Sequence, residues 1–144
     1  MAIRANAGTI TIKGGTYQVG ADKAGNPNTV VYASGSAKVI IEGGYFEYTG
    51  GEGKEKSVAK FLLNVKDADY SPTDPLKANI IVKGGTFKNF NPCANQAEGA
   101  NTSFVPSTHE VVLAGTDYAT TKDYLNSAAY TNGEAVEYTV QEKK

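Results

Sequence analysis

Three stretches of the chain repeat nearly the same phrase: Thr9–Tyr17 (TITIKGGTY), Lys38–Phe46 (KVIIEGGYF) and Asn79–Phe87 (NIIVKGGTF). Each contains a short run of β-branched residues, then a Gly-Gly pair, and ends on an aromatic residue. Recurrence of one such unit is typical of a solenoid, in which every repeat stacks on the one before it. The phrase therefore predicts the architecture of the protein, and it indicates much less about activity.

The glycine pairs recur at unequal intervals: 29 residues separate Gly14 from Gly43, and 41 separate Gly43 from Gly84. An unchanged phrase at unequal spacing indicates a constant coil whose loops vary in length. The additional length falls in two stretches rich in turn-forming residues, Gly50–Lys56 and Asp67–Pro75.

A second apolar run lies between successive glycine pairs, first at Thr29–Ala33 and then at Lys60–Val65. Each coil should therefore hold at least two strands. These strands must pair in parallel with the equivalent strand of the next coil, about 4.8 Å away. We predict an all-β fold, a short parallel β-helix of about three coils with an irregular C-terminal cap. The alternative is a β-sandwich of hairpins, which does not require the same phrase at every corner.

Aligned phrases place residues in columns that alternate between the interior and the outside of the coil. The predicted interior columns are Ile10, Val39 and Ile80; Ile12, Ile41 and Val82; and the aromatic residues Tyr17, Phe46 and Phe87. An outward column between the first two holds Thr11, Ile40 and Ile81. Two stacked isoleucines facing water predict a subunit interface at Ile40 and Ile81. Scattered surface apolar residues are the alternative.

The chain is predicted to be one domain, with coils in residues 1–88 and a closing coil and C-terminal cap in residues 89–144. The features of this cap are a polar, turn-rich stretch at 89–106, a helical composition at 119–130 and an alternating final strand at 135–140. The first strand begins near Gly8 without a cap, and an uncapped coil exposes unpaired backbone groups. We therefore expect either further β-helix coils or another subunit at this N-terminal edge.

Composition limits the classes of partner. The net charge is −1 and no basic run occurs, so neither nucleic acid nor a membrane surface is expected. No stretch is long and apolar enough to span a bilayer, and the first residues lack the apolar core of a secretory signal. The single cysteine, Cys93, excludes an internal disulfide framework.

The sequence contains no recognisable catalytic motif. The only histidine, His109, would have to act with Cys93 or Ser103 in a nucleophilic site, and no neighbouring residues support this. We therefore predict no catalytic residues. One turn offers three carboxylates that could bind calcium, namely Asp67, Asp69 and Asp74. Their spacing matches no calcium loop, and acidic residues are common in turns, so no metal and no cofactor is predicted.

Tyrosine is frequent, with 9 residues, and exposed tyrosines suit stacking on sugars or contact with proteins. The predicted ligand contacts are Tyr45, Tyr48 and Tyr70, and aromatic packing at the corners of the coil is the alternative. A carbohydrate-active enzyme would instead need acidic residues that converge with lysine on one face. The candidates for that set are Glu42, Glu47 and Lys83.

The consensus Ile-x-Ile-x-Gly-Gly-Thr-Phe/Tyr resembles repeats of the right-handed parallel β-helix proteins of the pectate-lyase-like superfamily. More narrowly, it resembles glycine-glycine repeats of gut-bacterial surface proteins and of fibre or tail proteins of their phages, over about residues 8–113. The resemblance implies a right-handed coil. It also implies a non-catalytic structural or adhesive module of a virion or cell surface, oligomeric, with a trimer favoured. The clustered acidic or basic residues of the superfamily's enzymes have no counterpart here.

Two other functions remain as alternatives at this point. One is a module that binds a host surface glycan through the exposed tyrosines. The other is a fragment of a carbohydrate-active enzyme, such as a polysaccharide lyase or depolymerase.

Overall fold

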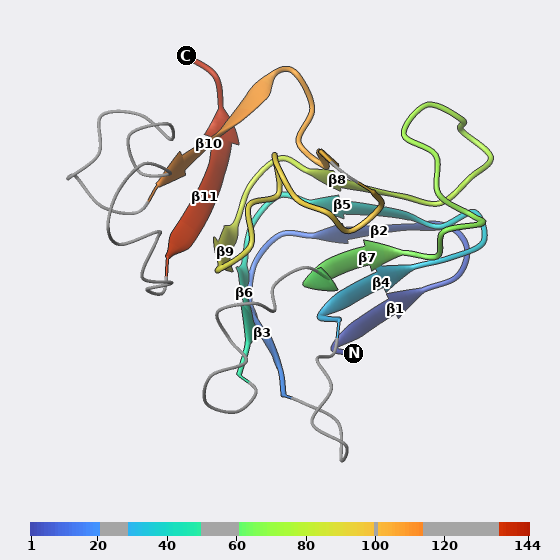
Figure 1. The fold of residues 1–144 in the computed structure, drawn as a ribbon, viewed down its shortest axis with the longest axis horizontal. Coiled ribbons are helices and arrows are strands. Elements are labelled where there is room, and N and C mark those ends of the chain that lie inside the picture. The colour runs from blue at the N-terminus through green and yellow to red at the C-terminus, as the bar shows by residue number, and fades with distance from the viewer. Residues whose placement is uncertain (21–28, 50–60, 100, 114–135) are drawn as a thin grey trace.

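The structure is a computed structural model that describes residues 1–20, 29–49, 61–99, 101–113 and 136–144. This part of the chain is all-β and forms three consecutive coils of a short parallel β-helix (Figure 1). The first coil contains β1 (Ile3–Ala5), β2 (Thr9–Ile12) and β3 (Thr16–Val19). The second contains β4 (Val31–Ala33), β5 (Lys38–Ile41) and β6 (Tyr45–Tyr48). The third contains β7 (Leu63–Val65), β8 (Asn79–Val82) and β9 (Thr86–Lys88).

The prediction of a parallel β-helix is confirmed, and each coil has three strands where the sequence identified at least two. The phrase strands appear as β2, β5 and β8, and the second apolar runs appear as β4 and β7. The sequence did not anticipate the strands that follow each glycine pair, β3, β6 and β9, nor the short strand β1. The short run Ser103–Val105, which follows the third glycine pair in the sequence, lies in a loop. The stretches at Gly50–Lys56 and 119–130 lie outside the described residues.

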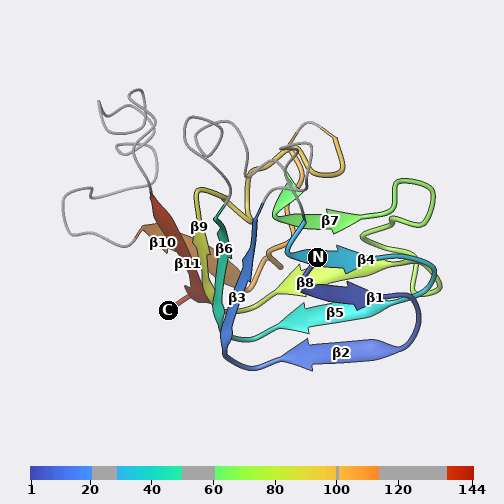
Figure 2. The same cartoon turned by 90° about the horizontal axis from the view of Figure 1, so that it is seen from below.

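Three sheets form the sides of the coil, and Figure 2 shows the stack from another side. Two sheets are wholly parallel, with strand orders β1-β4-β7 and β2-β5-β8. In the third, β3, β6 and β9 are parallel, and β11 (Glu137–Glu142) and β10 (His109–Leu113) continue it in antiparallel pairing. The final strand was predicted at 135–140, and its antiparallel direction was not.

The aligned columns of the phrase are confirmed by the register. Val39 lies between Ile10 and Ile80, and Ile40 lies between Thr11 and Ile81. Val39 and Ile80 are fully buried, as the predicted interior column requires. Burial of such side chains stabilises the fold by about 1.5–3 kcal/mol each.

The aromatic column forms a stack just past the glycine corner. The rings of Tyr17 and Phe46 lie 5.2 Å apart between centroids, and those of Phe46 and Phe87 lie 4.9 Å apart. Their planes are nearly parallel, at 15° and 9°. Ring spacing in this range is favourable beyond simple burial, so the stack helps to hold successive coils in register.

The two glycines of each corner are required for different reasons. The second glycine takes a positive φ, 112° at Gly44 and 96° at Gly85, which side chains rarely adopt. The first glycine is close to the coil beneath it. A Cβ added at Gly43 would lie 2.4 Å from the carbonyl oxygen of Lys13, and one at Gly84 would lie 2.1 Å from that of Glu42.

The third coil is covered by the C-terminal part of the chain. Strand β11 pairs with β9, and the Thr86 and Thr139 hydroxyls are 2.9 Å apart. Residues 89–99 and 101–105 run beside the other two sheets, where the Val82 N–H donates to the carbonyl oxygen of Phe104 at 2.8 Å. Phe90 and Phe104 are buried in this closing segment. Within the described residues, no helix is long and apolar enough to cross a bilayer.

Candidate functional site

The first coil leaves one edge of each sheet without a strand partner among the described residues. The Lys38 and Glu42 N–H groups donate to the carbonyl oxygens of Gly8 and Ile12, both at 2.8 Å. Backbone groups of neighbouring residues in a strand point to opposite sides. The N–H groups of Thr9 and Thr11 therefore point away from β5, toward the open side. This edge can accept another strand.

The inward side chains of the first coil are only partly covered. Ile10 is 36% exposed, whereas its column neighbours Val39 and Ile80 are fully buried. Tyr17 stacks on Phe46 with one face and is partly buried. The N-terminal edge thus combines unpaired backbone groups with apolar surface, a combination that supports strand addition.

The outward column lies on the other side of the same sheet. Ile40 and Ile81 are directly paired across β5 and β8, and both are half-buried. Their outward orientation follows the predicted face, with the neighbouring residues of both strands buried in the core. The structure therefore places the two predicted interface residues together.

The three tyrosines predicted as ligand contacts lie in different surroundings. Tyr48 points inward and belongs to the core, with 8% of its surface exposed. Its role is therefore the alternative one, aromatic packing within the coil. Tyr45 is on the outside of β6, where its hydroxyl donates to Glu137 Oε1 at 3.1 Å. Burial, followed by this hydrogen bond, raises the pKa of Tyr45 to about 12. Tyr45 and Tyr48 therefore do not share a site with Tyr70.

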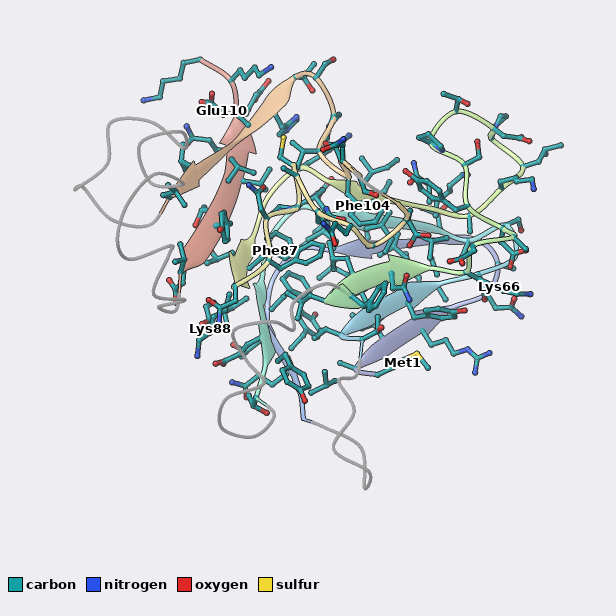
Figure 3. All side chains as sticks on the ribbon, viewed as in Figure 1. Met1, Lys66, Phe87, Lys88, Phe104 and Glu110 are labelled. Atoms are coloured by element: carbon teal, nitrogen blue, oxygen red, sulfur yellow. The ribbon has the colours of Figure 1, made fainter. Side chains whose placement is uncertain are left out.

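Tyr70 lines a pocket of about 630 Å³ beside the edge strand β7. Phe61, Asn64 and Asp67 contribute the wall from the third coil, and residues 96–99 contribute the wall from the closing segment. The Tyr70 ring also packs edge-on against Phe104, at 6.3 Å between centroids. Figure 3 labels Phe104, which belongs to the closing segment. The pocket thus joins two segments that are distant in the sequence.

Glu98 is the polar group that links the closing segment to the third coil. Its Oε1 accepts a hydrogen bond from the Val65 N–H at 2.5 Å, on the side of β7 that has no strand neighbour. Burial raises the pKa of Glu98 to about 7, the Val65 hydrogen bond opposes this, and the Asp67 charge adds to it. Asn64 Oδ1 is also buried here, and no described residue forms a hydrogen bond with it. Sequence reasoning missed both residues, since nothing local marks them.

The remaining candidates are not brought into one site. His109 Nδ1 lies 2.8 Å from Thr108 Oγ1, while the exposed Cys93 lies near Ser103 on another segment. Asp69 accepts from the Gly35 N–H at 2.8 Å, and no group of three metal-binding side chains occurs among the described residues.

Glu47, one of the acidic residues considered for carbohydrate chemistry, forms an ion pair with Lys88 and not with the expected Lys83. Glu47 pairs with Lys88 at 2.6 Å and also accepts from Gln18 Nε2 at 2.8 Å. Lys88 lies on the outside of β9 (Figure 3). The Lys88 hydrogen bond, opposed by burial, lowers the pKa of Glu47. The carboxylate is therefore engaged within the outer face of the sheet rather than with Lys83.

Comparison with protein-family models, curated proteins and solved structures gave no match to this chain.

Proposed function

We propose that the chain is a non-catalytic structural or adhesive module that acts by association, as an oligomeric component of a phage fibre, tail or cell surface. The observation that supports this most directly is the outward pair Ile40 and Ile81, placed side by side on a regular stack of coils. A rigid β-helix with an apolar outer strip is suited to bury that strip against another subunit. A trimer is the favoured assembly.

The solution mass tests this proposal. Light scattering of the wild-type chain should give an oligomer, and Ile40→Asp or Ile81→Asp should shift it toward the monomer because each change places a charge in the contact. Thr11→Asp is the matched control, since it adds the same charge to the same outward column at a polar position. A wild-type monomer at high concentration, or an oligomer indifferent to both isoleucine changes, would contradict the proposal.

A second candidate function, binding of a host surface glycan, is supported by the pocket at Tyr70. Pockets that bind sugars offer aromatic faces together with a few polar groups that fix orientation. Here Phe61 and Tyr70 supply the aromatic side chains, and Asn64 and Glu98 supply the polar ones.

A glycan array separates the two functions. Asn64→Ala and Tyr70→Ala should each abolish glycan binding, while Tyr45→Ala should leave it unchanged, because Tyr45 lies outside the pocket. Asn64→Ala is included because Tyr70 also packs on Phe104, so its removal affects folding as well. Binding that survives Asn64→Ala would exclude this pocket as the glycan site.

A further inference from the structure

Gly14 is a glycine that no contact within the described chain requires. Gly43 and Gly84 occupy the same place in the phrase, and each leaves room for a backbone carbonyl of the coil beneath. None of the three has a positive φ, so backbone conformation does not explain them. A Cβ added at Gly14 would meet nothing within 4 Å. The space that Gly14 keeps open is the space that the next coil uses at Gly43 and Gly84.

We propose that the first coil is a docking surface for a parallel β-helix coil of another protein chain. The backbone of that coil passes beneath Gly14 as Lys13 passes beneath Gly43. Its strand pairs with the open N–H and C=O groups of Thr9 and Thr11. Its inward side chains cover Ile10, which is 36% exposed. Strand addition of this kind draws affinity from main-chain hydrogen bonds and specificity from alternate side chains.

Charge defines the partner further. The corner position before each glycine pair is Lys13, then Glu42, then Lys83, and all three are exposed. Opposite charges at stacked positions are mildly favourable. Arg4 and Lys13 are the only charged side chains in residues 1–20. The coil that docks beneath Lys13 therefore carries an acidic corner residue, as the second coil does.

A second copy of this chain does not fit the same description. Its own third coil is covered by β11 and by the closing segment. It could offer only its first coil, and that would bring Lys13 and Arg4 of both copies to one interface. Two positive edges offer each other no acidic corner residue, so that arrangement lacks the opposite-charge pairing seen between the coils. The occupant is therefore a different β-helix chain with a glycine-glycine corner and an acidic residue before it.

The test uses the full chain and a synthetic peptide of its own second coil, Thr29–Thr49. This peptide contains all three strands of a coil, the glycine pair and Glu42 at the corner. Hydrogen exchange is measured at the Thr9 and Thr11 amides of the full chain as peptide is added. We expect both amides to become protected. A Glu42→Lys peptide should bind more weakly, because its corner would repel Lys13.

Gly14→Ala is the decisive variant. It should weaken peptide binding at least about tenfold, because a Cβ at the corner would overlap the docked backbone. Its thermal midpoint should match that of the wild type, since the space around Gly14 is open, and this shows that lost binding is not unfolding. Thr11→Pro should also block binding by removing an N–H from the open side, whereas Thr11→Val should keep it.

Three results would overturn this inference: no protection of the wild-type amides, equal binding by Gly14→Ala, or a dimer of the full chain that protects the same amides without peptide. The inference rests on the proposed structural role and does not depend on self-association. Failure of the two is distinguishable, since a monomer insensitive to Ile40→Asp would refute the oligomer while leaving peptide docking intact.

Discussion

The first and third coils have nearly the same phrase and different surroundings. The third coil is covered by β11 and by residues 89–99 and 101–105, whereas the described chain leaves the first coil open. Ile80 is fully buried in the third coil, and Ile10, its counterpart in the first, is 36% exposed. The same residue in the same place thus contributes differently to stability according to what lies beneath or above it. In a solenoid, the repeated phrase determines the backbone path of each coil. The adjacent coil determines how much the side chains of that coil contribute to the stability of the fold.

The largest expected effect is the difference in stability lost when a ring is removed from the middle of the aromatic stack or from its open end. Phe46→Ala should lower the free energy of unfolding by about 3–5 kcal/mol, because the ring is fully buried between two others. Tyr17→Ala should cost clearly less, since Tyr17 stacks on one side only and is partly exposed. Urea denaturation of both variants measures the difference. Equal losses would show that the first coil is as tightly packed as the second.

The glycine corners give the next contrast. Gly84→Ala should cost about 1–3 kcal/mol, because the new Cβ would lie 2.1 Å from the Glu42 carbonyl oxygen and the backbone must shift. Gly14→Ala should stay within about 0.5 kcal/mol of the wild type, as surface changes usually do. Chemical denaturation of the isolated chain tests both. A large loss for Gly14→Ala would mean that the first corner is constrained within the chain itself.

The sequence predicted the parts of the fold that the phrase repeats. The columns at Val39, Ile41 and Phe46 could be aligned because a strand alternates with a period of two and the glycine pair fixes the register. Strand β1 was missed because Ile3–Ala5 does not belong to an apolar run, whereas β4 and β7, which are equally short, do. The direction of β11 was missed because alternation indicates a strand and does not specify its partner.

The candidate sites were predicted to a smaller extent. Ile40 and Ile81 could be paired because they belong to the repeated phrase. Tyr48 was assigned to the surface because strand β6 was not anticipated; in that strand Tyr48 lies two residues after Phe46 and takes the same inward face. Glu98 meets Val65 across 33 residues of sequence, in a closing segment without periodicity. Such a contact depends on the path of a loop, and no local pattern encodes that path.

The covered end contains a carboxylate whose charge opposes folding. The pKa of Glu98 rises from its ordinary 4.5 to about 7 on folding, so the folded state favours the protonated form. Stability should therefore be intact below about pH 4.5 and should fall as the pH rises through about 7. Glu98→Gln should remove this fall and make the chain more stable than the wild type at pH 8. The gain should be at most about 1 kcal/mol, because the open pocket screens the charge.

Thermal midpoints between pH 4 and pH 8 measure this effect. The glutamine variant keeps an oxygen that can accept the Val65 N–H, so its contact with β7 is preserved. Glu110→Gln serves as the control, because Glu110 lies on β10, away from the pocket. A wild-type midpoint that rises between pH 5 and pH 8 through Glu98 would contradict the assigned direction.

The smallest effect concerns the pair that links the second and third coils on their outer face. Glu47 has a lowered pKa because Lys88 donates to it, so its contribution is present above its ordinary pKa and is lost as the pH falls through the folded value. Lys88→Met should remove about 0.2–1 kcal/mol at pH 7, and less in high salt, since the pair is partly exposed. The acid-side loss of stability should shrink in the same variant. A loss from Lys88→Met as large as that from Gly84→Ala would give a different result. The outer face of this sheet would then stabilise the stacking of coils as strongly as the glycine corner does, and the contrast between covered and open coils would have to include their outer faces.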